Sequence, residues 1–382
     1  MKNKWFVSLL MVVVMMCACW TGAVAENERK MFTSGDYEYA LLDDGTVVIT
    51  RYKGKEERLA ISDMLDGKKV TAIGDWAFSW CDSLTSVTIP DSVTSIGDSA
   101  FSYCKSLTSI TIPDSVTSIG DSAFYSCDSL MSVTIPDSVA QIGVNPFAGC
   151  DALKILSVSP DHPYLAVIDG VLFRKADKTL ISYPARISSS TYAIPQGIIS
   201  IGDSAFYSCT SLASITIPDS VISIGDWAFP WCDSLTSVTI PDSVTAIGDS
   251  AFYSCRSLTS ITIPDSVASI GDGAFSSCSS LTSITIPDSI TSIGSNTFCE
   301  CTSLISVTMS DSVTSIGETA FFMCMFLTDV TIPDSVTFIG DGAFNMCFDL
   351  TLTVPRNSYA LEYAKANYIP YTYPDANDWL NN

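Results

Sequence analysis

Cysteine recurs at a fixed spacing along most of the chain and is the first candidate for chemistry. Eleven of the 14 cysteines stand 23 residues apart in two runs, which are Cys81, Cys104, Cys127 and Cys150, and then Cys209, Cys232, Cys255, Cys278, Cys301, Cys324 and Cys347. Stacked coils about 5 Å apart would bring such residues near disulfide range. Parallel stacking, however, points all these side chains the same way, which favours buried free thiols.

One further cysteine departs from the column. Cys299-Glu300-Cys301 is a lone Cys-x-Cys, which is weak evidence for a metal site. Cys299 occupies a variable position of the repeat, so it is the candidate for a reactive thiol.

Aspartate also recurs in two columns, one through Asp91 and Asp114 and the other through Asp75 and Asp98. Stacked carboxylates could share calcium, which takes several oxygen ligands. Hydrogen bonding within turns explains both columns without a metal, so we expect no metal and no cofactor.

Catalysis would need a distinctive set of residues, and the chain offers none. The only histidine, His162, lies in a Pro-flanked turn, where we expect it to be solvated. Catalytic triads and zinc sites built on several histidines therefore have too few histidines in this chain. Glycoside hydrolysis needs one singular carboxylate pair, but each column aspartate has many equivalents. The sequence predicts that the protein is not an enzyme.

The elements that position these columns are read from one period, Ser86 to Cys104. Leu84, Val87 and Ile89 alternate with Ser86 and Thr88, which predicts a short strand with the apolar side chains inward. Pro90 removes a ladder donor and ends the strand.

The rest of the period returns to the core after a turn at Asp91-Ser92. Val93 and Ile96 point inward, and Gly97 is expected to supply a backbone angle that other residues resist. Ala100, Phe101 and Cys104 then close the coil. A repeat of this length is the signature of a solenoid, here with a 23-residue period.

The repeat resembles a leucine-rich repeat and, in its cadence Ile-Pro-Asp-Ser-Val-Thr-Ser-Ile-Gly-Asp-Ser-Ala-Phe-x-x-Cys-x-Ser-Leu, the BspA-type family. The Ile-Gly step recurs eleven times from Ile73 to Ile339, and the resemblance covers roughly residues 70–355. It departs from the general leucine-rich pattern at Ser92, which stands where Asn or Cys belongs, and at Pro90. The resemblance implies a right-handed solenoid with a parallel β-sheet face, in secreted or surface-attached proteins that bind other macromolecules.

The chain divides into six segments. We expect a signal peptide over residues 1–25, an N-terminal cap over 26–70 with a β-hairpin at Asp44-Gly45, and leucine-rich repeats over 71–150 and 194–348. Residues 151–193 form an irregular repeat with a hairpin insertion, and 349–382 form a helical C-terminal cap and tail. Lipidation at Cys17 or Cys19 is an alternative to release of the chain from the cell, although neither site fully matches the cleavage pattern of a lipoprotein peptidase. No other stretch is long and apolar enough to span a bilayer.

The charge balance restricts the partners. The net charge is -22, and fifteen of the 19 Lys and Arg lie before Thr71 or within Lys154 to Arg186. An acidic surface repels phosphate, which argues against nucleic acid and anionic membranes.

Three surfaces are candidates for binding. The strand face presents hydroxyl groups in every coil, including Ser86, Thr88, Ser109, Thr111, Ser237, Thr239, Ser260 and Thr262. Aromatic residues occupy the variable positions between Phe and Cys, namely Trp80, Tyr103, Tyr125, Tyr207, Trp231, Tyr253 and Phe322. The insertion adds the basic residues Arg174, Lys175 and Lys178. Stacking within the solenoid is the alternative explanation for the hydroxyl and aromatic columns.

These features lead to two functional hypotheses. The first is a secreted or cell-surface protein that mediates protein–protein interaction, with host matrix or surface glycoproteins as the ligand class that the family implies. The second is a structural or self-assembling envelope component without a host ligand. The oligomeric state is not predicted.

Overall fold

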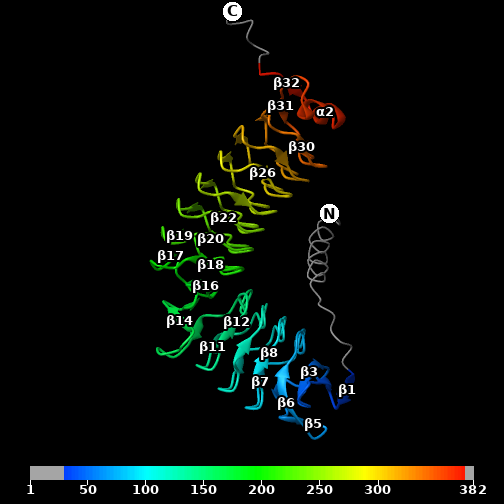
Figure 1. The fold of residues 1–382 in the computed structure, drawn as a ribbon, viewed down its shortest axis with the longest axis vertical. Helices are drawn as coiled ribbons and strands as arrows, with labels where there is room; N and C mark the ends of the chain where they lie inside the picture. The colour runs from blue at the N-terminus through cyan, green and yellow to red at the C-terminus, as the bar shows by residue number, and fades with distance from the viewer. Residues whose placement is uncertain (1–29, 375–382) are drawn as a thin grey trace, which may run out of the picture.

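The protein is a solenoid that curves into an arc, with one coil stacked on the next from end to end (Figure 1). The structure is a computed structural model and describes residues 30–374. The expected signal peptide, with Cys17 and Cys19, therefore lies outside the described residues. Within residues 30–374, no helix is long and apolar enough to cross a membrane.

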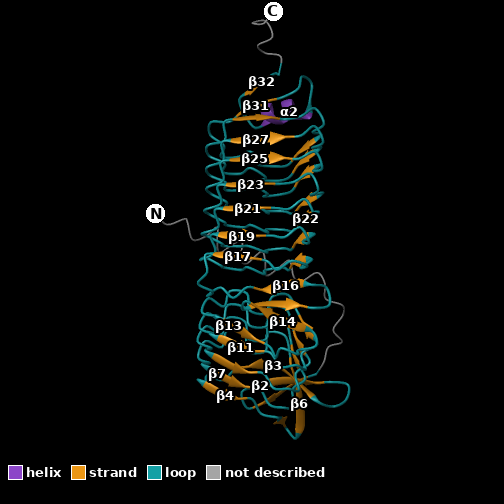
Figure 2. Ribbon diagram, turned by 90° about the vertical axis from the view of Figure 1, so that its left-hand side faces the viewer, coloured by secondary structure: helices purple, strands orange, loops and turns teal. Residues whose placement is uncertain are grey.

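Short parallel strands form one column along the solenoid (Figure 2). The middle residue of each typical strand is buried and its two neighbours face outward, as in β9, where Ile110 lies between exposed Ser109 and Thr111. Equivalent residues pair one period apart, for example Val87 with Ile110. The strands are β4 (Arg58–Ala60), β7 (Ser86–Thr88), β9 (Ser109–Thr111), β11 (Ser132–Thr134), β13 (Ile155–Ser157), β17 (Thr191–Ala193), β19 (Ser214–Thr216), β21 (Ser237–Thr239), β23 (Ser260–Thr262), β25 (Ser283–Ile286), β27 (Ser306–Met309), β29 (Asp329–Thr331) and β31 (Thr351–Thr353).

A second column of parallel strands runs beside the first and was not predicted from the sequence. Each strand is the two-residue step before the Gly, too short to show the alternation that identifies strands in a sequence. The members are β8 (Ser95–Ile96), β10 (Ser118–Ile119), β12 (Gln141–Ile142), β18 (Ser200–Ile201), β20 (Ser223–Ile224), β22 (Ala246–Ile247), β24 (Ser269–Ile270), β26 (Ser292–Ile293), β28 (Ser315–Ile316) and β30 (Phe338–Ile339).

Both ends of the solenoid carry caps. At the N-terminal end, β1 (Met31–Ser34), β2 (Tyr37–Leu41) and β3 (Val47–Tyr52) are antiparallel, which confirms the hairpin at Asp44-Gly45. Strand β3 then pairs in parallel with β6 (Lys68–Ile73), the start of the second column, and β5 (Met64–Leu65) forms a small hairpin with β6. The cap thus covers the apolar end of the first coil.

The C-terminal cap is a short helix and a last strand. Helix α2 (Tyr359–Ala366) begins after Ser358, whose hydroxyl accepts a hydrogen bond from Leu361 N at 3.1 Å. Strand β32 (Tyr371–Thr372) pairs with β31. The helical cap expected from the sequence is confirmed.

A stack of phenylalanine rings runs through the core. Consecutive rings lie close to parallel, as for Phe78 and Phe101, whose centroids are 4.9 Å apart, and Phe229 and Phe252, at 5.1 Å. The Leu, Val, Ile, Ala and Cys positions named from the repeat are buried around them. Because a fully buried Phe contributes about 1.5–3 kcal/mol, this stack stabilises every coil against its neighbours.

The expectation for Gly97 is wrong. Gly97 does not adopt a positive φ; in its loop the residues that do are Ser99, at 51°, and Tyr103, at 59°. Glycine is required at position 97 because a Cβ there would lie 2.3 Å from Asp75 Oδ1 and 2.7 Å from Asp75 N. The repeat therefore uses this glycine for close approach between coils.

The insertion interrupts both columns. Strands β14 (Leu165–Ile168), β15 (Val171–Arg174) and β16 (Thr179–Ser182) form an antiparallel meander, and β16 then pairs in parallel with β18. The buried core divides here into two clusters: Leu172 and Ile181 pack with the N-terminal one, while Val171 and Leu180 pack with the C-terminal one. The meander therefore joins two stacks of regular coils.

Candidate interaction surface

The cysteine column is held by hydrogen bonds between coils. Cys104 Sγ lies 3.1 Å from the carbonyl oxygen of Phe78, 26 residues earlier, and Cys255 Sγ lies 3.1 Å from that of Phe229. The same contact recurs in every regular coil through Cys347. All twelve cysteines of residues 30–374 are free thiols. The thiols thus tie each coil to the one before it.

The expectation of a reactive thiol at Cys299 is wrong. Its side chain is buried, and burial raises its pKa to about 12. A thiol with such a pKa is almost entirely protonated near neutral pH, while the thiolate is the reactive form. In this coil the side chain at the variable position is packed inside the protein rather than facing solvent.

The Asp75 column is a hydrogen-bond ladder. Asp75 Oδ1 accepts from Asp98 N at 2.8 Å, and Asp98 Oδ1 accepts from Asp121 N at 2.7 Å. The pattern repeats after the insertion from Asp203 to Ser295. Each carboxylate therefore satisfies the backbone of the next coil. Hydrogen bonding accounts for this column, but it runs between coils and not within a turn as expected.

The histidine does not lie in solvent, so that expectation is wrong too. His162 is fully buried. Its Nε2 lies 3.0 Å from Pro136 O, and its Nδ1 accepts from Tyr164 N at 3.2 Å and Leu165 N at 3.1 Å. The neutral ring with its proton on Nε2 satisfies all three contacts and fastens the insertion to the preceding coil.

The hydroxyl face of the first strand column is open. Except for half-buried Ser86, the eight residues named for it from the sequence are exposed, and among residues 30–374 none of these eight makes a side-chain hydrogen bond. Beside the insertion, Thr134 Oγ1 and Ser157 Oγ do share a hydrogen bond at 2.9 Å. Hydroxyls in adjacent columns are used instead between coils, as from Thr108 Oγ1 to Thr85 O at 2.9 Å. The face thus presents unpaired hydroxyls on a regular lattice.

Six of the predicted aromatic residues form one continuous series of ring contacts, which we call the aromatic ladder. Its members are Trp80, Tyr103, Tyr125, Tyr207, Trp231 and Tyr253. Successive centroids are 4.0, 5.2, 5.5, 5.0 and 5.3 Å apart. All six remain partly exposed, and Trp80 is 53% exposed. Phe322 makes no ring contact with another described residue and is not part of the ladder.

The ladder crosses the insertion because two coils lack the groups that would block it. Gly149, at φ +72°, has no side chain, and a Cβ there would lie 3.4 Å from the Tyr207 ring. The coil of the insertion is also shorter on this side, since Tyr183 follows Leu180 by three residues where Phe206 follows Ile201 by five. Tyr207 therefore reaches over this coil and forms a hydroxyl–hydroxyl hydrogen bond with Tyr125.

Two tryptophans beside the ladder escaped the sequence analysis. Trp227 contacts Trp231 and Tyr253, with centroids 6.0 and 5.2 Å apart. Trp76 is 53% exposed at the equivalent position of an earlier coil. Both replace the Ser that follows the Gly-Asp step in four other coils, a departure from the repeat that would have identified them.

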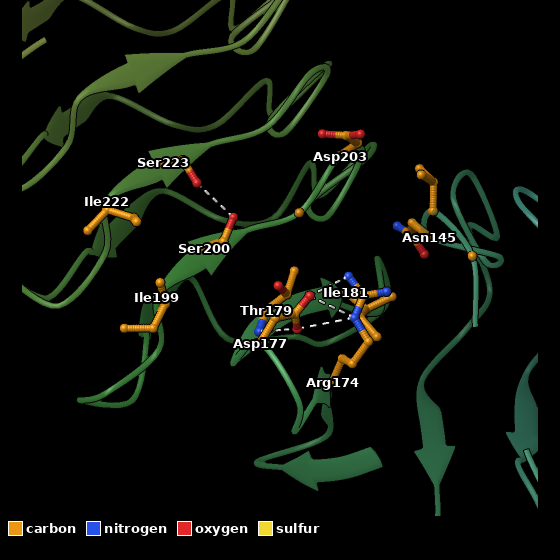
Figure 3. A pocket seen from close by; sticks show the side chains of 13 residues that line it. Asn145, Arg174, Asp177, Thr179, Ile181, Ile199, Ser200, Asp203, Ile222 and Ser223 are labelled. Atoms are coloured by element: carbon orange, nitrogen blue, oxygen red, sulfur yellow. Dashed lines mark hydrogen bonds and ion pairs between the residues drawn. The ribbon is translucent and has the colours of Figure 1, made fainter. Parts of the chain in front are cut away.

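The basic residues of the insertion are mostly engaged within the protein. Arg174 Nη2 lies 2.9 Å from Asp177 Oδ2, and its Nη1 donates to Ile142 O at 3.2 Å. Figure 3 shows this pair in a cavity of about 410 Å³ between the two stacks, opposite Asn145. Lys175 Nζ donates to His162 O at 2.5 Å, while Lys178 is exposed. Arg174 thus fastens the insertion to the preceding coil.

Comparison with known proteins identifies the family. A model described as BspA type leucine rich repeat region (6 copies) matches residues 71–189, 183–258 and 228–351. Because these matches span more than half of the chain, it belongs to the BspA-type leucine-rich repeat family. No curated protein matches the sequence.

Solved structures share the fold. A leucine-rich repeat protein from Eubacterium ventriosum ATCC 27560 is 25% identical with a TM-score of 0.56, over 82% of this chain and 93% of that one. One from Bacteroides ovatus ATCC 8483 is 26% identical with a TM-score of 0.51, over 90% and 99%. The pneumococcal vaccine antigen PcpA, at 20% identity and a TM-score of 0.59 over 88% and 96%, is similar in fold alone.

The family and the solenoid together define the class of protein. Leucine-rich repeat solenoids are scaffolds for protein interaction and are typically not enzymes. The chain is a repeat protein of this interaction class.

Proposed function

We propose that the protein is secreted or displayed on the cell surface and binds a protein or glycoprotein ligand, with host extracellular matrix as the ligand class. The observation that carries this proposal is the aromatic ladder. Its rings extend along six coils, three on each side of the insertion, and remain partly open to solvent. Tyr and Trp are enriched at the centres of protein interfaces because they bury a large area at low entropy cost.

The hydroxyl face supports the same function from a second side of the coil. Unpaired hydroxyls can donate to and accept from a partner over a long span. Secretion rests on the predicted signal peptide and on the family. No singular set of catalytic residues stands out in the repeats, which supports a binding role.

Retention of purified matrix proteins on the immobilised chain tests the proposal. The control is an unrelated solenoid of similar negative charge, which accounts for electrostatic adsorption. We expect at least one matrix protein to be retained well above the control. The proposal would be contradicted if every matrix protein tested were retained equally on this chain and on the control solenoid.

A further inference from the structure

Two cavities meet beside the aromatic ladder, at the insertion. The first, of about 300 Å³, is lined by Ser126, Asp128, Asp151, Tyr207, Ser208 and Trp231. The second, of about 550 Å³, shares Asp128 and Asp151 and continues toward the first strand column at Ser132. Two carboxylates thus lie on the boundary between an aromatic cavity and the hydroxyl face.

The hollow exists because one coil lacks a side chain. At the position two residues after the stacked Phe, other coils carry Tyr103, Ser126 or Trp231, while this coil carries Gly149. A Cβ on Gly149 would lie 2.9 Å from Ser126 Oγ and 3.4 Å from the Tyr207 ring. The absence of a side chain at Gly149 therefore sets this coil apart from its neighbours.

In the described part of the chain, Asp128 and Asp151 lack the ion pair that compensates the charge of Asp233 in the same column. Elsewhere in the same column, the residue after the Cys, Arg256 lies 3.9 Å from Asp233. Lys154 and Arg186 line the second cavity, but within residues 30–374 neither is ion-paired with Asp128 or Asp151. Burial raises the pKa of both aspartates; the charge of Asp128 adds to the effect on Asp151, and Lys105 opposes it on Asp128.

The aromatic wall favours a cation as well. The rings of Tyr207 and Trp231 are inclined at 57° with centroids 5.0 Å apart. A cation against such a ring gains about 0.5–2 kcal/mol, and a carboxylate beside it adds a charge-assisted hydrogen bond. Among the described residues, no group of three metal-ligating side chains converges, so the site does not resemble a metal centre.

We infer that this cavity binds a lysine or arginine side chain of the partner protein, an inference that rests on the proposed function. Asp128 and Asp151 hold the charged end, and the rings of Tyr207 and Trp231 contact the apolar stem and the cation. The net charge of -22 would draw a basic segment toward the solenoid. The site would then fix where on the repeated surface that segment docks.

A blocked tetralysine peptide tests the inference on the full chain, by calorimetric titration at about 0.15 M salt. The site variant is Asp128→Asn with Asp151→Asn. The matched control is Asp219→Asn with Asp242→Asn, which neutralises two exposed aspartates at the same spacing. We expect the affinity to fall at least about tenfold in the site variant and less than about twofold in the control. Trp231→Leu should weaken binding about fivefold with the charges intact.

Several outcomes would overturn the inference. They are no binding by the unaltered chain, equal losses in the two double variants, undiminished binding when every lysine of the peptide is acetylated, or calcium binding that depends on Asp128 and Asp151. Matrix-protein retention that survives in the site variant would overturn this inference alone. Tetralysine binding without retention of any matrix protein would overturn the proposed function and leave the cation site standing.

Discussion

The rings of Tyr125 and Tyr207, 82 residues apart in the chain, meet edge to face with centroids 5.5 Å apart. A second contact lies beside them, from Asn145 Nδ2 to Ser204 O at 2.6 Å. These contacts join two stacks of coils whose cores are separate. The aromatic ladder is thus both a surface and the link between the stacks.

Replacing Tyr207 by Ala should uncouple the stacks. We expect a loss of about 3 kcal/mol in the free energy of unfolding, because a large, mostly buried ring is removed. Urea unfolding should also broaden or split into two transitions. Tyr253→Ala is the control, since the ring contacts of Tyr253 within residues 30–374 are with Trp227 and Trp231, on one side of the insertion. A change in cooperativity that is the same in both variants would show that Tyr207 does not couple the stacks.

The thiols should be protected in the folded chain. Their burial and their hydrogen bonds to Phe carbonyls predict negligible alkylation by iodoacetamide at neutral pH, including at Cys299. Burial raises the pKa of half-buried Cys81 and Cys347 to about 12 as well. Peptide mapping after labelling measures each site, and unfolding in urea should expose all of them. Rapid native labelling of Cys299 would refute its assignment as a packed thiol.

The hydrogen-bond ladder of the Asp75 column should depend on an acceptor oxygen at each step rather than on negative charge. Asp249 Oδ1 accepts from Asp272 N at 2.8 Å, so Asp249→Ala should cost about 1 kcal/mol. Asp249→Asn keeps a carbonyl acceptor and removes a like charge from the column, so it should be neutral or stabilising. Thermal unfolding compares the two. Equal destabilisation by Ala and Asn, or a Tm that rises when calcium replaces chelator, would indicate a role for the negative charge.

Stability should rise on mild acidification. Burial raises the folded-state pKa of Asp98, Asp128, Asp151 and Asp203, with neighbouring carboxylates adding to the effect. The folded state therefore binds protons more tightly than the unfolded chain, and the unfolding free energy falls as pH rises through this window. We expect Tm to increase from pH 7 toward about pH 5.

Further acidification should reverse this gain. Hydrogen bonds from Thr46 and from Ser34 lower the pKa of Asp44 and Asp66, whose contributions are lost below about pH 4. A Tm that falls steadily from pH 7 downward would contradict the prediction.

The regular coils were predictable because their period fixes which side chains are buried. The positions of Val87, Phe101 and Cys104 follow from a pattern that many copies repeat. The second strand column was not predictable, since a two-residue strand such as Ser95–Ile96 is defined by its neighbours in space rather than by its own sequence.

The features of the insertion depended on long-range geometry. His162 is buried because β14 and the preceding coil close around it, which no local pattern reveals. The contact between Tyr125 and Tyr207 depends on which coils are short and on Gly149. The Ala148-Gly149 pair, standing where most other coils carry two aromatic or hydroxyl side chains, was the signal available in the sequence.

The aromatic ladder as a protein-binding surface is tested most directly by the affinity of a retained matrix protein for two variants. The ladder variant replaces Trp80, Tyr103 and Trp231 by Ser. The control variant replaces Phe326 and Phe348 by Ser; these two side chains are 61% and 67% exposed and are not members of the ladder. We predict that the ladder variant loses at least about a hundredfold in affinity, since hot-spot aromatics contribute 2 kcal/mol or more each, while the control changes less than about threefold. Equal affinities of the ladder variant and the unaltered chain would contradict the account.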